Sequence, residues 1–274
     1  MFLPRFPRLI PLTLVLAAVL SGLAATGAQA GETLDKMRQT GELRVGLTGD
    51  YRPFSMRDRK SDTGPETNTG IGPFSGLDVD LARSLAGAMR LKLVIVPTSW
   101  PTLSDDLTAG RFDVGMGGIS VTEARREIGL FSVPMMSDGK TPITRCENVD
   151  RFQTLDQIDR EGTRVIVNPG GTNEKFARAN IHKATIILHP ENLTIFDEII
   201  AGRADLMITD AIETRLQSKL HPELCAVHPD TPFDRSEKAY WMPKDPELKA
   251  EVDHWLIRFK EIGALQRKID EWVE

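Results

Sequence analysis

Segments with the character of strands and of helices alternate along this chain, and that alternation constrains the fold more than any other feature of the sequence. Short apolar runs at 43–47, 92–97 and 113–116 resemble buried strands, and helical patterns at 77–89 and 100–109 separate them. A helical turn is expected at 122–127. Because βαβ units build parallel sheets, the sequence predicts an α/β fold with a mostly parallel sheet flanked by helices.

The same alternation recurs downstream. Strands are expected at 164–167, 185–188 and 204–208, and helices at 174–180 and 193–201. The sequence therefore predicts two similar lobes with a cleft between them. Lobe 1 would comprise 31–134 plus 239–274, lobe 2 would comprise 140–228, and the chain would cross between them at 133–145 and 227–239. A C-terminal helix at 247–274 would return to lobe 1, and the Gly- and Pro-rich segment 57–76 is expected to form a surface loop.

The first thirty residues have the pattern of a secretory signal peptide. Arg5 and Arg8 precede an apolar run at 9–23, and the segment ends in small residues up to Ala30. We expect cleavage after Ala30 and a periplasmic location, with an uncleaved anchor as the alternative. Cleavage takes the formal charge from −5 to −7, which disfavours a nucleic-acid partner, and no later segment is apolar enough to hold the mature protein in a membrane.

The two cysteines of the chain are Cys146 and Cys225. In an oxidising compartment a disulfide between them is the expected state, and a free buried pair is the alternative.

Motifs for metals and common cofactors are not evident. The five histidines show no ligand spacing, neither cysteine has a partner two residues away, and the run Gly115–Gly118 does not match a dinucleotide-binding motif. We therefore expect no metal and no organic cofactor.

Loops that could bind anions follow several predicted strands, where open α/β sheets place their ligands. In the first loop, Gly118, Ser120 and Thr122 would offer backbone and hydroxyl donors, and Arg125 could bind a carboxylate through two hydrogen bonds. The alternative is that Ser120 or Thr122 caps a helix and Arg125 is solvated.

Further candidates lie in the second half of the chain and beside two strands of the first. The loop 168–174 offers Thr172, Asn173 and Glu174, and Glu174 could equally be a glutamate favoured by the helix dipole. Asp210 could bind an ammonium group or cap a helix. The two aromatic side chains that could wall a ligand, or belong to the core, are Tyr51 and Trp100.

These residues carry a family resemblance. The segments 41–54, 78–81 and 118–125 resemble the amino-acid solute-binding proteins (family 3) of ABC importers. Three further stretches, 97–101, 138–144 and above all 167–180, resemble the periplasmic cyclohexadienyl dehydratases of that superfamily, as do 209–213 and 220–229. The resemblance covers nearly all of the mature chain and implies a type II periplasmic-binding-protein fold.

The resemblance implies a carbon–oxygen lyase that converts prephenate to phenylpyruvate and arogenate to phenylalanine without a cofactor. Glu174 would be the general acid. It would be protonated when the cleft closes on the dianionic substrate, because burial then outweighs the helix dipole. Arg125, Ser120 and Thr122 would bind a carboxylate, Asp210 an amine, and Lys140 a second carboxylate unless it is an ordinary surface lysine. The alternative function is a non-catalytic amino-acid receptor of an ABC importer. The sequence leaves open whether the protein is a monomer or a homo-oligomer.

Overall fold

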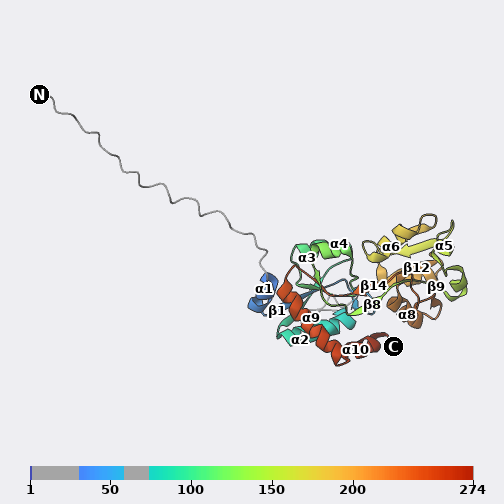
Figure 1. Ribbon diagram of the computed structural model, residues 1–274. Coiled ribbons are helices and arrows are strands. Elements are labelled where there is room, and N and C mark those ends of the chain that lie inside the picture. The colour runs from blue at the N-terminus through green and yellow to red at the C-terminus, as the bar shows by residue number, and fades with distance from the viewer. Residues whose placement is uncertain (2–30, 59–73, 274) are drawn as a thin grey trace.

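The structure is a computed structural model that describes residue 1 and residues 31–58 and 74–273. It has two α/β lobes side by side, as the alternation predicts (Figure 1). The predicted signal peptide lies outside the described residues except for Met1. Among the described helices, none combines the length and the apolar character that crossing a bilayer requires.

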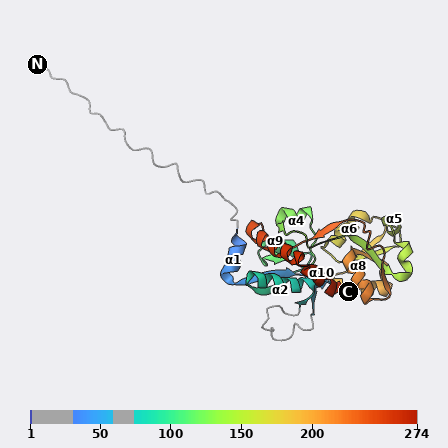
Figure 2. The same cartoon turned by 60° about the horizontal axis from the view of Figure 1, so that its bottom comes forward.

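Lobe 1 is defined here by the five-stranded sheet of order β5-β1-β6-β15-β7. Its strands are β1 (Glu42–Leu47), β5 (Lys92–Pro97), β6 (Val114–Gly115), β7 (Leu130–Phe131) and β15 (Trp241–Met242). Strand β15 alone runs antiparallel to its two neighbours in this sheet, so the other four strands point the same way. The helices of the lobe are α1 (Glu32–Thr40), α2 (Leu77–Met89), α3 (Leu103–Thr108), α4 (Glu123–Ile128) and α9 (Pro246–Glu261) (Figures 1 and 2).

Lobe 2 is defined by the sheet of order β11-β10-β12-β9-β13. Its strands are β9 (Lys140–Arg145), β10 (Arg164–Val167), β11 (Thr185–Leu188), β12 (Leu206–Asp210) and β13 (Leu224–Ala226). Here β9 is the antiparallel strand. The helical segments are η2 (Cys146–Arg151), α5 (Leu155–Ile158), α6 (Thr172–Asn180), η3 (Asn192–Thr194), α7 (Ile195–Ile200) and α8 (Ala211–Leu220). Each sheet is therefore mostly parallel, which confirms the predicted fold class.

The chain passes between the lobes on two strands that pair with each other. Strand β8 (Met136–Asp138) lies antiparallel to β14 (Ser236–Lys238), with Lys238 opposite Met136. Figure 1 shows both strands between the lobes. In each lobe, the antiparallel strand is the one that follows a crossing. The boundaries 31–134 plus 239–274 for lobe 1, and 140–228 for lobe 2, stay a prediction.

Alternate residues of the central strands of lobe 2 pack on opposite faces of its sheet. Leu206 and Ile208 belong to one buried cluster, whereas Met207 between them belongs to another. Lobe 1 instead has one large cluster around α2 and α9 and a smaller one around Trp241. Because both faces of a parallel sheet are covered, such strands are apolar throughout, which is why their sequence signal is strong.

Two predictions of secondary structure are wrong in part. The C-terminal segment is not one helix: it forms α9 and then α10 (Ala264–Val273), separated at Gly263, whose φ of +67° is left-handed. The predicted loop 57–76 begins and ends in strands, because β3 (Ser55–Arg57) pairs with β4 (Phe74–Ser75) and the Phe74 side chain is buried. The residues between them, 59–73, lie outside the described residues. A short strand β2 (Asp50–Tyr51) completes this small sheet.

Helix α10 contacts both lobes, as both overall views indicate (Figures 1 and 2). The indole Nε1 of Trp272 donates to Asp80 of α2 at 3.1 Å, and Lys219 Nζ of α8 donates to the carbonyl oxygen of Val273 at 2.9 Å. The last helix thus joins lobe 1 to lobe 2 independently of the crossing strands.

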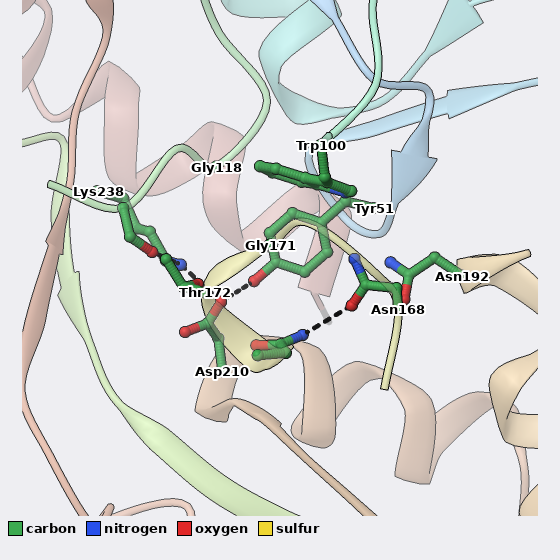
Figure 3. A pocket seen from close by; sticks show the side chains of 11 residues that line it. Tyr51, Trp100, Gly118, Asn168, Gly171, Thr172, Asn192, Asp210 and Lys238 are labelled. Atoms are coloured by element: carbon green, nitrogen blue, oxygen red, sulfur yellow. Dashed lines mark hydrogen bonds and ion pairs between the residues drawn. The ribbon is translucent and has the colours of Figure 1, made fainter. Parts of the chain in front are cut away.

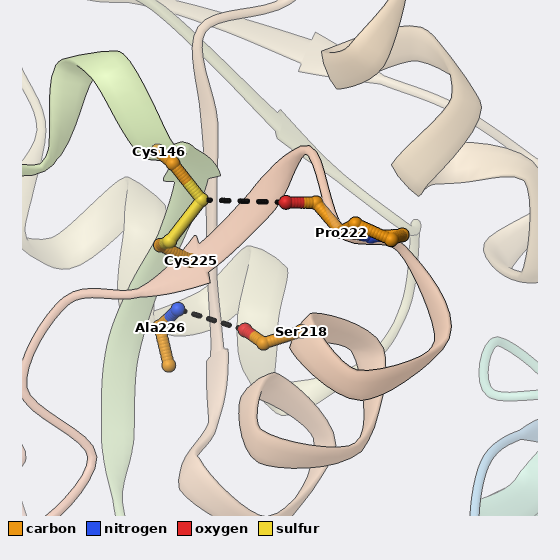
Figure 4. Close-up of a disulfide and its surroundings, with 5 residues drawn as sticks. All are labelled: Cys146, Ser218, Pro222, Cys225 and Ala226. Carbon is orange, nitrogen blue, oxygen red and sulfur yellow. Dashed lines mark hydrogen bonds between the residues drawn. A yellow bond between two sulfur atoms is a disulfide. The ribbon is translucent and has the colours of Figure 1, made fainter.

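The expected disulfide between Cys146 and Cys225 is confirmed (Figure 4). It connects the first residue of η2 to β13, next to the pairing of β13 with β9. The Ala226 amide in the same strand donates to Ser218 Oγ of α8 at 2.8 Å. The covalent bond therefore fastens an edge of the lobe 2 sheet.

Candidate active site

A narrow pocket lies between the lobes (Figure 3). Its cavity of about 20 Å³ has room for little more than one water molecule, so the cleft is shut in this structure. The lining residues are Tyr51, Trp100, Gly118, Ser120, Asn168, Gly171, Thr172, Asn173, Asn192, Asp210 and Lys238. Seven of the substrate-binding residues predicted from the sequence are brought together here: Tyr51, Trp100, Gly118, Ser120, Thr172, Asn173 and Asp210.

Two aromatic rings from lobe 1 form one wall. Tyr51 lies in β2, directly after β1, and Trp100 follows β5. Their ring centroids are 5.7 Å apart in an edge-to-face arrangement, and Trp100 Nε1 donates to Asp50 Oδ1 at 3.0 Å. Since both rings follow the ends of neighbouring parallel strands, the fold places them together without further constraint.

Asp210 is the centre of charge in the pocket. Its Oδ1 accepts from Lys140 Nζ at 2.8 Å, and its Oδ2 accepts from Lys238 Nζ at 2.6 Å and from the Tyr51 hydroxyl. All four side chains are almost fully buried. Burial raises the pKa of the Asp210 carboxyl, but the two ammonium groups outweigh burial and hold that pKa below its usual range. The Asp210 side chain makes no capping hydrogen bond to α8. Its two oxygens accept hydrogen bonds from the lysines instead.

Lys140 is buried rather than on the surface. Its Nζ also donates to Thr172 Oγ1 at 3.1 Å and to Asn173 Oδ1, which ties β9 to the first turn of α6. Lys140 is outside the set of lining residues, so it reaches the pocket through these partners. The alternative of an ordinary surface lysine is wrong.

Arg125 and Thr122 do not line the pocket in this structure. The Thr122 hydroxyl caps α4 by accepting the Arg125 amide at 3.3 Å, which is the capping alternative. The Arg125 guanidinium is buried against Trp241 and donates from Nη1 to the carbonyl oxygen of Ser120 at 2.8 Å. Burial lowers the pKa of Arg125 to about 10. The Arg125 guanidinium thus lies behind the loop that carries Ser120. The alternative prediction, that Arg125 is solvated, is wrong because the residue is buried.

The Gly118 loop is held by a carboxylate from α2. Asp78 Oδ2 accepts the amides of Gly117 and Gly118 at 2.7 and 2.8 Å, and Asp78 Oδ1 accepts the Tyr240 hydroxyl. Burial raises the pKa of Asp78 to about 6, against these hydrogen bonds. Both glycines have positive φ, and a Cβ at Gly118 would meet the Phe54 ring at 2.5 Å. The residue type at Gly118 is therefore dictated by packing as well as by the pocket.

A second buried carboxyl group lies behind the lobe 2 wall. Asn173 Nδ2 donates to Thr209 Oγ1 at 3.0 Å, and Thr209 donates in turn to Glu213 Oε2 at 2.6 Å. Burial raises the pKa of Glu213 to about 8, so this carboxyl group is largely protonated at neutral pH. Glu213 is thus a neutral buried acid that the sequence analysis did not single out.

The protonation of Glu174 beside a bound substrate stays a prediction, and the structure shows the local partners of this side chain. Its Oε2 accepts the Gly170 amide at 2.7 Å and its Oε1 accepts Arg178 Nε at 2.8 Å, one helical turn further along α6. These two donors, the Gly170 amide first, lower the pKa of Glu174. The side chain is outside the set of lining residues, although its neighbours Thr172 and Asn173 belong to it. Burial does not raise the pKa of Glu174 above its usual value here, because local donors form hydrogen bonds with both carboxylate oxygens.

Sequence reasoning missed four lining residues: Lys238, Asn168, Gly171 and Asn192. Asn168 and Gly171 lie in the loop that the sequence singled out, and only their roles were unassigned. Asn192 reaches across the cleft, because its Nδ2 donates to the carbonyl oxygen of Asp50 at 2.8 Å. Lys238 comes from crossing strand β14, and nothing in its local sequence distinguishes it from a solvated lysine.

Within 31–58 and 74–273, no group of three or more His, Cys, Asp or Glu side chains could hold a metal ion.

Comparison with known proteins defines the class of this fold and site. Residues 43–274 match the model of the bacterial extracellular solute-binding proteins, family 3, and the chain belongs to that family. An L-cystine-binding protein of Escherichia coli strain K12 is 25% identical over 93% of this chain and 91% of its own length.

Within the family, the chain is similar to dehydratases. The cyclohexadienyl dehydratase of Pseudomonas aeruginosa is 52% identical over 94% of this chain and 92% of its own length. An ancestral amino-acid-binding protein described as a precursor of cyclohexadienyl dehydratase superposes with a TM-score of 0.78 at 32% identity, over 88% of this chain and all of that one. An ancestral cyclohexadienyl dehydratase gives 0.53 at 46% identity, over 88% and 95%. The predicted resemblance is confirmed, and the chain is an enzyme of the carbon–oxygen lyase class.

Proposed function

We propose that the protein converts prephenate to phenylpyruvate, and arogenate to phenylalanine, in the cleft between its lobes. The observation that carries this proposal is the 52% identity to a cyclohexadienyl dehydratase over nearly the whole chain. The site adds support, because the same pocket is lined by two aromatic rings, a buried lysine, and amide and hydroxyl side chains, which suits a cyclohexadiene ring with two carboxylates.

The reaction needs a proton donor and a shaped anion site. The ring carboxylate leaves as CO₂, its electron pair aromatises the ring, and the ring hydroxyl leaves as water after gaining one proton. A positioned acid contributes typically ~10²–10⁴ to the rate of such a step. Tyr51 and Trp100 would hold the ring, and Thr172, Asn173 and Ser120 would offer donors to its polar groups.

Glu174 would supply the proton after its side chain turns toward the cleft. Its backbone directly follows the lining residues Thr172 and Asn173 at the start of α6, and in this proposal a change of rotamer would bring the carboxyl group toward the pocket. The turn removes the Gly170 and Arg178 donors that now lower its pKa, and a bound dianion raises it further. Arg125 would bind a substrate carboxylate by exchanging for it the hydrogen bond that it now donates to the Ser120 carbonyl oxygen.

The proposal includes export. The family is described as extracellular, and residues 1–30 would direct the chain to the periplasm and be removed after Ala30. The disulfide of lobe 2 is compatible with that oxidising compartment.

Turnover of prephenate by the purified mature protein tests the function. We expect phenylpyruvate to form, and Glu174→Gln to reduce kcat by at least 10²-fold while the protein stays folded and still binds phenylpyruvate. Lys175→Gln, at the next position of α6, is the matched control and should retain activity. Retention of most activity in Glu174→Gln would contradict the role of Glu174. An inactive wild type that binds amino acids tightly by calorimetry would instead favour an importer receptor.

A further inference from the structure

The residues that line the pocket include no carboxylate that is available to accept hydrogen bonds from the ammonium group of a substrate. Asp210 is the one carboxylate among the lining residues of the described chain, and its two oxygens already accept two ammonium groups and a phenol. An amino acid bound through its ammonium group would have to displace Lys140, Lys238 or Tyr51.

The other carboxyl groups near Asp210 are committed elsewhere. Asp138 accepts the backbone amides of Gly139 and Ala211 at 2.8 and 3.0 Å and of Ile212 at 3.4 Å. Glu213 accepts from Thr209 and lies behind the wall. Neither belongs to the lining residues, so neither replaces Asp210 as an ammonium acceptor.

Lys238 is the cation that does line the pocket. Its Nζ donates to Ser120 Oγ at 2.8 Å as well as to Asp210, and it lies 5.6 Å from the centroid of the Tyr51 ring. The lysine is 1% exposed and sits on the crossing strand, from which its Nζ reaches both Ser120 of lobe 1 and Asp210 of lobe 2. Figure 3 shows its side chain beside that of Asp210. An anion entering between Tyr51 and Ser120 therefore encounters this ammonium group.

We propose that Lys238 is a specificity-determining residue: it binds a carboxylate of the substrate and, by sharing Asp210 with Lys140, keeps that aspartate from binding an ammonium group. The inference rests on the proposed dehydratase function and deepens it. It explains how a fold whose relatives include amino-acid-binding proteins can accept a keto acid: a lysine of the protein takes the position in which an amino acid would place its own ammonium group.

The test compares two substrates that differ only at this group. Prephenate carries an oxo group where arogenate carries an ammonium group. In Lys238→Met, Asp210 Oδ2 loses one donor and the site loses a positive charge. We expect kcat/KM for prephenate to fall about 10²-fold or more, mainly through KM, and the arogenate-to-prephenate ratio of kcat/KM to rise at least about tenfold.

Two further variants separate charge from structure. Lys238→Arg retains the positive charge and should keep the ratio within about threefold of the wild type. Lys244→Met removes an exposed lysine six residues further along the chain and should leave kcat/KM unchanged for both prephenate and arogenate. If Lys238→Met does not fold, Lys238→Gln keeps a hydrogen-bond donor without charge and should shift the ratio in the same direction.

A purely structural role gives a different result. Equal losses of kcat/KM for both substrates in the uncharged variants, with an unchanged ratio, would overturn the proposal. Failure of the wild type to turn over either substrate would count against the dehydratase function instead. Calorimetry then tests Lys238 independently: Lys238→Met should gain affinity for phenylalanine relative to phenylpyruvate, and an unchanged preference would refute the assignment.

Discussion

The two lobes contribute unequally to the site and to the stability of the fold. Lobe 1 packs one large apolar cluster around α2 and α9 and presents aromatic rings and a glycine loop to the pocket. Lobe 2 divides its core between the two faces of its sheet and presents amides, hydroxyls and Asp210. The lobe with the smaller cores also carries the disulfide and most of the polar chemistry.

The difference shows how a polar wall can be supported. Three polar side chains of lobe 2 that line the cleft have buried partners behind them, with Thr209 behind Asn173 and Lys140 behind Thr172 and Asp210. Such pairing matters because buried polar groups are costly unless they are paired. Apolar burial alone contributes less in this lobe, so the covalent bond offsets part of that cost.

The largest expected effect on this comparison comes from removing the disulfide. The two cysteines are 79 residues apart, and opening a loop of that size costs about 4 kcal/mol of stability in the chain-entropy model. In the double variant Cys146→Ser, Cys225→Ser, we expect hydrogen exchange to accelerate in lobe 2 and to stay nearly unchanged in lobe 1. Equal acceleration in both lobes would show that they unfold as one unit and would break the distinction.

A smaller effect concerns the buried carboxyl groups, which should give the lobes different pH dependence. The pKa of Glu213 is raised from 4.5 to about 8, so the folded state binds this proton more tightly than the unfolded state. The free energy of unfolding therefore falls as pH rises through that window. The pKa of Asp78 in lobe 1 is raised from 3.8 to about 6, so the fall in stability that this group causes ends near pH 6.

Glu213→Gln should remove the decline above pH 6. We expect the variant to gain roughly 2–4 kcal/mol relative to wild type between pH 5 and pH 9, measured by urea unfolding at each pH. Asp78→Asn is the matched comparison, and its effect should be complete by about pH 7. A difference between Glu213→Gln and wild type that does not vary with pH would mean that Glu213 is ionised in the folded protein.

The smallest expected effect concerns Arg178. Its guanidinium side chain is 56% exposed and helps to lower the pKa of Glu174, so Arg178→Met should raise that pKa. Because the proposed acid must be protonated, the limb of the pH profile of kcat/KM on which activity falls should move to higher pH. Arg160→Met, an exposed arginine in the same lobe, is the control. If the pH profile of Arg178→Met matches that of the control, Arg178 does not affect the pKa of Glu174 in the active enzyme.

The fold was readable from the sequence where burial leaves a local signal. The helix at 77–89 and the strands at 92–97, 164–167 and 185–188 have the predicted bounds, because elements buried on one face or both show continuous or periodic apolar residues. The break at Gly263 was missed because a single glycine is tolerated in many helices. Strand β4 was missed because glycines and a proline surround Phe74 in the sequence, whereas its strand conformation depends on pairing with the distant β3.

The site was readable where residues follow strand ends, as Tyr51, Trp100 and Asp210 do. Lys238 was not, since its position depends on pairing between residues about 100 apart in the sequence, which no local pattern reports. The state of Glu174 is a different case. Arg178 stands one helical turn away in the sequence, and an acidic residue four positions before an arginine favours an ion pair. That signal, weighed more heavily, predicts an ionised Glu174 in the shut structure.

The hydrogen bond between Tyr51 and Asp210 has a kinetic consequence. It joins Tyr51 of lobe 1 to Asp210 of lobe 2 at the pocket, whose cavity of about 20 Å³ has room for little more than one water molecule. Each catalytic cycle must therefore break this contact to admit substrate and break it again to release product. The same aspartate that sets the charge of the pocket thus acts as its latch, and the rate at which the latch opens places an upper bound on turnover.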